Sequence, residues 1–303
     1  MQPDLTLVAD GLAFPEGPIA MPDGSIVLVE IKTGHLSRVR NGRKELVADL
    51  GGGPNGAAIG PDGHCYVCNN GGFEWIQSQG RTYPGAQPDD YQGGSIQRVN
   101  LETGRVQTVY THCDDEPLKG PNDIVFDAQG GFWFTDHGKY RPRDRDRTGV
   151  FYALPDGSQI TEVIFPLEAP NGIGLSKDEN EVFVAETPTG HLWAYPILSP
   201  GQIDARKPRR LLNGRPGHYM FDSLAVDANG DVCVATLLDG GITTLSVTDA
   251  PPVFVAMPDR ITTNICFGGP DLKTAYITLS STGQLVSMDW PVGGLPLNFL
   301  NQG

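Results

Sequence analysis

Short apolar runs alternate with turn residues along the whole chain, and no segment shows a sustained 3.6-residue apolar period. This pattern predicts strands rather than helices. One unit recurs six times in the chain. A polar residue opens the unit, a short apolar run follows, a turn comes seven to eight residues later, and an apolar and aromatic strand completes it. Residues 14–30 (FPEGPIAMPDGSIVLVE) and 221–236 (FDSLAVDANGDVCVAT) are two copies of this unit.

The opening polar residue, here called the opener, sets the register of each unit. The six openers are Glu16, Asn55, Asn122, Asn171, Asp222 and Asn264. The position eight residues after the opener is glycine in four of the six units, as a tight hairpin turn with positive φ demands. The residue before that position is a turn-compatible Asp, Asn or Gln in every unit. The fixed offset predicts one hairpin geometry for all six units.

The openers are separated by 39, 67, 49, 51 and 42 residues. Units of about 40 to 50 residues with four strands each are typical of β-propeller blades. We therefore predict an all-β fold, with residues 1–303 forming one six-bladed β-propeller domain whose inner strands begin near residues 16, 55, 122, 171, 222 and 264. The sixth unit has only two clear strands after Asn264, so we predict that residues 5–9 (LTLVA) add its outermost strand and close the ring.

The predicted register gathers all six openers at one mouth of the central channel, because every inner strand begins there. Two carboxylates that converge on one axis repel each other unless a cation lies between them. We therefore predict a metal site at this mouth. Its ligands are Glu16, Asn171 and Asp222, with Asn122 as a further contact. Asparagine after proline also caps turns, and this alternative applies first to Asn55 and Asn264.

The predicted ligands are all carboxylate or amide oxygens, which suits a hard cation. The sequence therefore predicts one bound divalent cation. Ca²⁺ fits best, and Zn²⁺, Mn²⁺, Mg²⁺ and Fe²⁺ are the alternatives. The protein offers fewer ligands than Ca²⁺ takes, so waters should complete the coordination. An open coordination sphere would allow catalysis at the ion.

Four motifs on this repeat carry a family resemblance. FPEGP, PND, PNG and the Asp222 of FDSLAVDANGDVCVA, in that order, resemble the SMP-30/gluconolactonase family, also called regucalcin-like. The resemblance covers nearly the whole chain. It implies that Glu16, Asn171 and Asp222 bind one divalent cation, and that Asn122 contacts metal, water or substrate. It also implies that Asp222 is the general base of lactone hydrolysis. Members of the family open sugar lactones, and a related branch hydrolyses organophosphates.

The chain also departs from that family pattern at two positions. Gly120 stands where sugar-lactonase members often carry arginine, two residues before the substrate-contacting asparagine. Phe-Asp-Ser replaces the usual Pro-Asp-Gly around Asp222. Both differences leave the metal ligands in place, so the resemblance extends to the metal site and not to sugar specificity.

Two long loops are expected to overhang the metal, residues 71–93 and residues 137–148. Such insertions at a propeller mouth often form lids or recognition walls, and the alternative is a solvated surface loop. The candidate substrate contacts are Asn122, Asn55, Trp75, His137, Tyr140, His218 and Tyr219. His137 and His218 are also candidate proton shuttles, with a structural role as the alternative.

Composition excludes several classes of partner. The net charge of −14 and the lack of a basic run without acidic neighbours argue against nucleic acid. No apolar run approaches membrane-spanning length, and the first ten residues have no secretory pattern, so we expect a cytoplasmic protein. Cys65 and Cys68 form a C-x-x-C on an alternating strand, where residues three apart face opposite ways. We therefore predict buried, unpaired thiols rather than a metal or redox pair.

Together these features predict a metal-dependent hydrolase that opens lactones, of the gluconolactonase-like kind that acts on a sugar lactone or a related lactone. The metal would polarise the carbonyl, and Asp222 would act as general base on water. Its partner would be a small-molecule lactone, and the protein would be a monomer or small homo-oligomer. Two alternatives remain: a phosphotriesterase-type hydrolase on the same metal, and a non-catalytic Ca²⁺-binding propeller.

Overall fold

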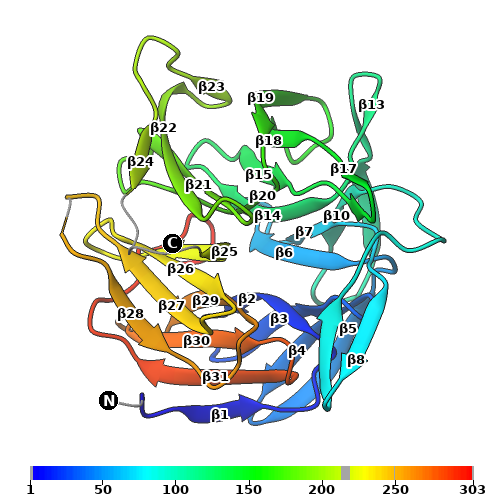
Figure 1. Cartoon of the computed structure of the whole chain (residues 1–303), viewed down its shortest axis with the longest axis vertical. Helices are drawn as coiled ribbons and strands as arrows, with labels where there is room; N and C mark the ends of the chain where they lie inside the picture. The colour runs from blue at the N-terminus through cyan, green and yellow to red at the C-terminus, as the bar shows by residue number, and fades with distance from the viewer. Residues whose placement is uncertain (1–2, 213–218, 249, 302–303) are drawn as a thin grey trace.

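The computed structural model describes residues 3–212, 219–248 and 250–301. Within these residues, six antiparallel sheets are arranged in a ring around a central axis (Figure 1). Each sheet is one blade, and neighbouring inner strands contact each other around the whole ring. The six-bladed all-β architecture predicted from the repeat is confirmed. No helix among the described residues is long and apolar enough to cross a membrane.

The blades follow one strand order, from the axis outward. The inner strands are β2 (Pro15–Ala20), β6 (Pro54–Ile59), β14 (Pro121–Phe126), β20 (Pro170–Leu175), β25 (Met220–Val226) and β29 (Thr262–Gly268). The second strands are β3 (Ile26–Glu30), β7 (Cys65–Asn69), β15 (Phe132–Asp136), β21 (Glu181–Glu186), β26 (Val232–Leu237) and β30 (Thr274–Leu279). We number the blades 1 to 6 in the order of these inner strands.

The outer half of each blade is less regular in length. The third strands are β4 (His35–Arg40), β10 (Ser95–Val99), β18 (Thr148–Ala153), β22 (His191–Ser199), β27 (Gly241–Leu245) and β31 (Gln284–Asp289). The outermost strands are β5 (Arg43–Asp49), β11 (Val106–Tyr110), β19 (Ile160–Leu167), β24 (Arg210–Leu212), β28 (Val253–Ala256) and β1 (Thr6–Ala9). In blade 4, β23 (Gln202–Ile203) also pairs with β22.

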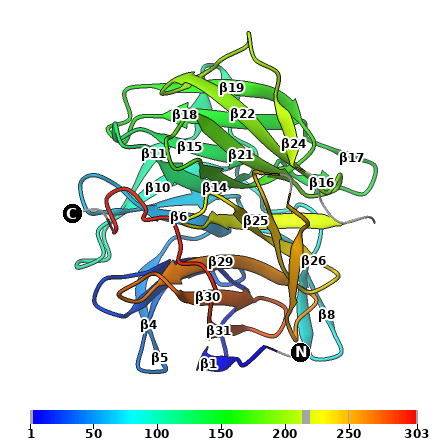
Figure 2. The ribbon, with the colours of Figure 1, turned by 90° about the vertical axis from the view of Figure 1, so that its left-hand side faces the viewer.

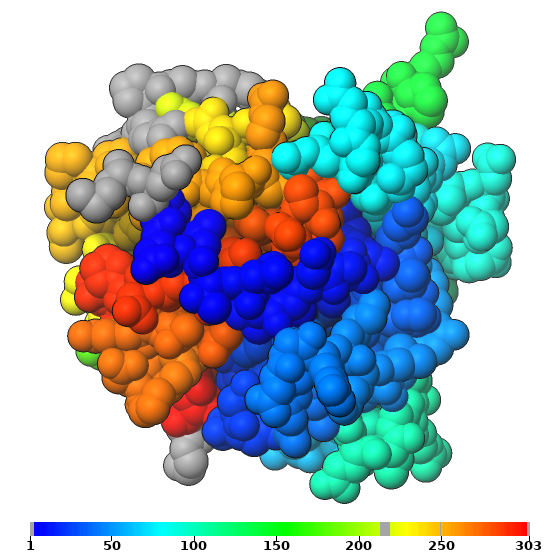
Figure 3. Space-filling model, turned by 90° about the horizontal axis from the view of Figure 1, so that it is seen from below, coloured from blue at the N-terminus to red at the C-terminus, as the bar shows by residue number. Residues whose placement is uncertain are grey.

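The N-terminal strand closes the ring, as predicted. β1 pairs antiparallel with β31, the third strand of blade 6, with Thr6 opposite Ser287 and Ala9 opposite Leu285. Seen from below, the dark-blue N-terminal segment lies against the orange chain of blade 6 (Figure 3). Both ends of the chain therefore contribute to one sheet, so the ring cannot open without breaking that sheet.

The hairpin between first and second strands has one geometry in all six blades. The residue eight positions after each opener has positive φ, between 54° and 90°, in every case. Four of these residues are glycines, and the others are Glu179 and Leu272, which adopt the same conformation at a steric cost. Glu179 is held there by its carboxylate, which accepts hydrogen bonds from the backbone of Ala128 and from Asn298.

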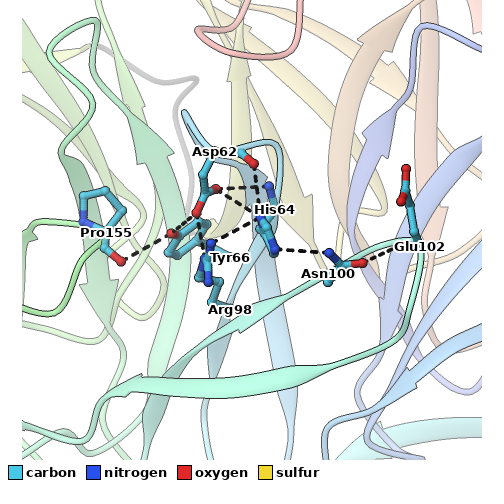
Figure 4. A network of polar contacts seen from close by, with 7 residues as sticks. All are labelled: Asp62, His64, Tyr66, Arg98, Asn100, Glu102 and Pro155. Carbon is cyan, nitrogen blue, oxygen red and sulfur yellow. Dashed lines mark hydrogen bonds and ion pairs between the residues drawn. The ribbon is translucent and has the colours of Figure 1, made fainter.

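An aspartate fixes each of these turns by accepting a backbone N–H two residues further on. In blade 2, Asp62 accepts from the backbone N–H of His64 at 3.1 Å and binds Arg98 and the Tyr66 hydroxyl (Figure 4). In blades 3 and 5 the aspartate lies two positions earlier, as Asp127 and Asp227, and accepts in the same way. The turn residues of the repeat are therefore explained by local hydrogen bonding.

The core lies between neighbouring blades. Phe132 on β15 packs toward Tyr66 of blade 2, with ring centroids 5.8 Å apart, and the next residue, Trp133, faces blade 4. Because successive side chains of a strand point to opposite faces of the blade, each strand contributes to two separate apolar layers. Truncating one such buried aromatic to alanine costs about 3–5 kcal/mol.

The five cysteines are buried and unpaired, as predicted. Cys65 packs in the layer between blades 1 and 2, and Cys68 packs in the layer between blades 2 and 3. Burial raises the pKa of the Cys65 thiol to about 12. These thiols therefore pack as small apolar side chains.

Candidate metal centre

Each inner strand begins with an irregularity that positions the opener. In all six blades the pairing of first and second strands shifts register at or just after the opener, for example between Glu16 and Ile19 in blade 1. Such bulges re-aim side chains beside functional sites. The residue two before the opener has positive φ at Phe14 (60°) and Ala169 (47°), so the chain turns sharply into Glu16 and Asn171.

A buried acid at the end of the second strand holds these turns in three blades. Asp136 accepts hydrogen bonds from the backbone N–H groups of Lys119 and Gly120, both at 2.7 Å. Glu30 accepts from the backbone of Ala13 at 2.7 Å in blade 1, and Glu186 accepts from Glu168 at 2.8 Å in blade 4. These acids fix the loops that lead into Glu16, Asn122 and Asn171.

Glu16 is the most buried of the two acidic openers, with 2% of its surface exposed. Its Oε2 accepts from Asn264 Nδ2 at 2.7 Å and from the backbone of Gly17 at 2.6 Å. Burial raises the pKa of Glu16, and these two hydrogen bonds oppose that rise. The carboxylate is thus held rigidly, but no ion pair with a basic side chain of the described residues neutralises it.

The Asp222 carboxylate interacts electrostatically with the Glu16 carboxylate across the channel. Burial and the Glu16 charge both raise the pKa of Asp222 well above its usual range, while a hydrogen bond from Asn171 lowers it. The structure therefore brings together two acids that are 206 positions apart in the chain. Repulsion of this kind is relieved when a cation binds between the two carboxylates.

Two amide oxygens at the same mouth are buried without a hydrogen-bond partner among the described residues. They are Oδ1 of Asn122 and Oδ1 of Asn171. The amide nitrogen of Asn171 donates to Thr187 Oγ1 at 3.1 Å, which orients the oxygen. Buried carbonyl oxygens normally have a donor, and these two lack one. Two carboxylates and two unpaired amide oxygens fit the all-oxygen environment of a hard divalent cation.

The remaining openers differ from each other. Asn264 is fully engaged, because its Nδ2 donates to Glu16 and its Oδ1 accepts from the backbone of Ile265 at 2.8 Å. Asn264 therefore orients Glu16 rather than offering an oxygen to a metal. Asn55 is buried, with 6% exposed. Among the described residues, no group of three or more His, Cys, Asp or Glu side chains is placed to hold a metal, and the candidate ligand set combines two carboxylates with amides.

One acid at this centre was missed in the sequence. Asp123 follows the opener Asn122, is 7% exposed, and interacts electrostatically with both Glu16 and Asp222. Burial and the Glu16 charge raise its pKa to about 8. The sequence did contain a signal for this acid, because Asp123 is the only acidic residue that directly follows one of the six openers. A cavity along the axis runs from Asp123 toward the opposite mouth.

The predicted loops meet above this mouth. β8 (Trp75–Ser78) and β9 (Arg81–Pro84) form a hairpin in residues 71–93. The backbone of Thr82 donates to Ser281 of blade 6 at 3.0 Å, and the backbone of Gln87 donates to Tyr140 of blade 3 at 2.9 Å. The insertion from blade 2 therefore reaches the chain of two other blades. β12 (His112–Cys113) and β13 (Glu116–Pro117) form a shorter hairpin between blades 2 and 3.

The aromatic residues predicted to contact the substrate differ in burial and in the residues that they pack against. The Trp75 ring packs on Phe14 at 5.1 Å, two residues before Glu16. Tyr140 is 58% exposed on the second insertion. Tyr219 stacks on Phe221, with ring planes 12° apart. His218 lies outside the described residues.

His137 lies at the end of β15, between the loops that carry Asn122 and Asn171. Its backbone N–H donates to Gly120 at 2.9 Å, and its ring donates to the backbone carbonyl of Pro170. Burial and the charges of Arg145 and Lys139 lower the pKa of His137 to about 3. The imidazole is therefore neutral at physiological pH, which argues against its predicted role as a proton shuttle near neutrality.

Comparison with known proteins identifies the family. Residues 14–281 match the family described as SMP-30/Gluconolactonase/LRE-like region. The chain belongs to this family. Lactonase drp35 of Staphylococcus saprophyticus is 30% identical over 262 residues, which cover 86% of this chain and 74% of that protein. Lactonase drp35 of Staphylococcus aureus is 26% identical over 262 residues, with the same coverage.

Solved structures share the fold of this family member. A gluconolactonase from Xanthomonas campestris superposes with a TM-score of 0.75 at 20% identity, covering 95% of this chain and 89% of the other. Regucalcin from Agrobacterium tumefaciens, described as a calcium-binding protein, superposes with a TM-score of 0.71 at 18% identity, covering 93% and 92%.

Proposed function

We propose that this protein is a divalent-metal-dependent lactonase. The observation that carries the proposal is the set of oxygens at one channel mouth: two carboxylates with raised pKa values and two buried amide oxygens without donors. Family membership and relatives named as lactonases support the same activity.

Glu16, Asn171 and Asp222 would hold the cation, with Asn122 as a fourth protein contact. When bound, the cation supplies Lewis-acid polarisation of the lactone carbonyl. The all-oxygen donor set favours Ca²⁺. Asn264 keeps the Glu16 carboxylate in place through its hydrogen bond of 2.7 Å.

Asp222 would remove a proton from the attacking water. The water oxygen then bonds to the carbonyl carbon, the ring C–O bond breaks, and Asp222 returns the proton to the departing ring oxygen. The product is a hydroxy acid, and no other reactant is consumed. The hydrogen bond from Asn171 favours the ionised form of Asp222 that this role requires.

The test is hydrolysis of simple γ- and δ-lactones and aldonolactones by chelated protein to which Ca²⁺, Mg²⁺, Mn²⁺, Zn²⁺ or Fe²⁺ is returned. We expect activity only with metal. Asp222→Asn should lower kcat by about 10²- to 10⁴-fold, because the general base is lost. Its melting temperature should stay near that of the wild type.

Asp271→Asn is the matched control, because it removes the same charge from an exposed turn at the other end of blade 6. Its activity should equal that of the wild type. Lactone hydrolysis that is indifferent to EDTA would overturn the metal mechanism. Hydrolysis of phosphotriesters without any lactone hydrolysis would replace the proposed reaction with the organophosphate alternative.

A further inference from the structure

The second insertion carries an arginine without a partner. β16 (Tyr140–Arg141) and β17 (Asp144–Arg145) form a hairpin between the second and third strands of blade 3. Arg141 pairs with Asp144 and with Asp146 at 2.8 Å, and Arg147 pairs with Glu168 at 3.7 Å. Among the described residues, no hydrogen bond or ion pair involves the side chain of Arg145, and its Nε is buried without a partner.

An unpaired guanidinium is unexpected at this place. The chain has 36 acidic residues against 22 basic ones, so carboxylates are abundant. The nearest acids of blade 3 are already engaged: Asp136 accepts three backbone N–H groups, and Asp146 binds Arg141 and the backbone of Lys139. A partly buried guanidinium with a desolvated nitrogen needs an acceptor, and the described residues do not supply one.

Arg145 lies beside a second unpaired group. The backbone N–H of Asp146 donates to Lys139 at 3.0 Å, and a Cβ at Gly138 would come within 2.9 Å of the Asp146 Cβ, so the chain at Arg145 lies against the residues that follow His137. His137 Nδ1 is also buried without a partner. Since the ring donates to the carbonyl of Pro170, that bond uses Nε2, and Nδ1 is left as an acceptor. Among the described residues, Arg145 Nε therefore lacks an acceptor and His137 Nδ1 lacks a donor.

These two groups lie next to the metal ligands. Pro170, which accepts from the His137 ring, directly precedes Asn171. Gly120, which accepts from the His137 backbone, lies two residues before Asn122. A Cβ at Gly120 would come within 2.8 Å of the carbonyl oxygen of Gly138, so the chain has no room for a side chain there. Arg145 and Lys139 are thus the two cations of the second insertion whose charges act on His137, and Lys139 already donates to the backbone carbonyls of Asn70 and Gly72.

We propose that Arg145 and His137 form a subsite for a carboxylate and an adjacent hydroxyl of the substrate. The inference rests on the proposed lactonase function and names its substrate class: lactones that keep a free carboxylate and a hydroxyl, such as monolactones of aldaric acids. The planar guanidinium binds the carboxylate in a forked arrangement, as arginine does better than lysine. Nδ1 of neutral His137 accepts from the hydroxyl.

The test compares an aldaric acid 1,4-lactone with the aldonic acid 1,4-lactone that has a hydroxymethyl group in place of the carboxylate. The wild type should prefer the acidic lactone by about 10- to 100-fold in kcat/KM, as expected for a charge-assisted hydrogen bond. Arg145→Gln should bring this ratio close to one, mainly through KM. Arg145→Lys should keep part of the preference for the acidic lactone, because lysine retains the positive charge but cannot form the two parallel hydrogen bonds of a guanidinium.

Arg143→Gln is the control, since Arg143 is exposed at the turn of the same hairpin and its removal changes the net charge equally. It should leave the ratio unchanged. A wild type without preference, or a ratio unaltered in Arg145→Gln, would overturn the subsite while the lactonase function stands.

If neither lactone is hydrolysed with any metal, the proposed function fails, and calorimetry with Ca²⁺ and the open-chain aldarate or aldonate still tests the subsite. Tighter binding of the aldarate that is lost in Arg145→Gln supports the subsite. Equal binding of both acids refutes it.

Discussion

Two asparagine openers at the channel mouth have different roles because their hydrogen-bond partners differ. Asn122 and Asn264 are both openers, and both are about 5% exposed. The oxygen of Asn264 accepts a backbone N–H and its nitrogen donates to Glu16. The oxygen of Asn122 has no donor among the residues that the structure describes. We therefore interpret Asn264 as a structural cap, and Asn122 as a group that keeps an oxygen for a ligand.

This difference predicts opposite results for one substitution at two positions. Asn122→Leu should leave the metal-free protein as stable as the wild type or more stable, because a buried unsatisfied carbonyl costs about 1–3 kcal/mol. It should also reduce the rise in melting temperature that Ca²⁺ produces. Asn264→Leu should destabilise the metal-free protein, because it leaves Glu16 without its donor.

Thermal unfolding with EDTA and with excess Ca²⁺ measures both effects. If Asn122→Leu instead weakens the metal-free fold and responds to Ca²⁺ like the wild type, Asn122 is a cap and not a ligand.

The two insertions are joined by a buried lysine. Lys139 is 1% exposed, and its ammonium donates to the backbone carbonyl of Asn70 at 3.0 Å and to that of Gly72. It also lies over the Phe73 ring, 4.2 Å from the centroid. The second insertion thus anchors the start of the first one. A second anchor is the ion pair of Arg81 with the buried Asp259, at 2.9 Å.

Burial lowers the pKa of Lys139 from 10.5 to about 8. Between these values the unfolded chain binds a proton that the native state does not, so the contribution of Lys139 to stability increases as pH rises from 8 toward 10.5. Below pH 8 the lysine is protonated in both states, and the cost of burying its charge is constant.

We therefore expect the free energy of unfolding of the wild type, relative to Lys139→Met, to increase between pH 8 and pH 10. Urea denaturation at several pH values measures this difference. Lys273→Met, at an exposed position, serves as the reference for general pH effects. A relative stability that is constant across this range would contradict the lowered pKa.

The whole ring is closed at its edge and covered at one end of its axis. β1 completes blade 6, and the C-terminal segment crosses the channel at the mouth opposite the candidate metal centre, where it appears red in Figure 2. The backbone of Leu295 donates to Val226 at 2.8 Å, and Asn298 donates to the backbone of Phe126 at 3.1 Å. We therefore expect a substrate to reach the candidate metal centre from the opener side.

Ring closure predicts a large effect from a small truncation. Removing residues 2–9 should lower the melting temperature by more than about 10 °C, because β31 loses its outer partner and blade 6 loses its tie to the N-terminus. Removing only residues 2–4, which precede β1, should have little effect. Equal melting temperatures for the two truncations would show that β1 does not hold the ring closed.

The sequence alone was sufficient to determine the local features of this protein, which are the opener positions and the hairpin turns. Each opener and the turn eight residues later depend on backbone conformation and on neighbours within the same hairpin, so even Glu179 and Leu272 adopt the conformation that glycine marks elsewhere. The count of units then determined the number of blades. These features could be predicted because they repeat at fixed offsets.

Only the tertiary structure decided which polar groups remain unpaired. Asn122 and Asn264 occupy equivalent positions in the sequence repeat. Asp123 directly follows the opener Asn122, and Arg145 is one of four arginines in the second insertion. Their roles depend on partners in other blades or insertions, such as Glu16 for Asn264, which is 248 positions away. Distances of this kind are set by closure of the ring, and no local pattern contains them.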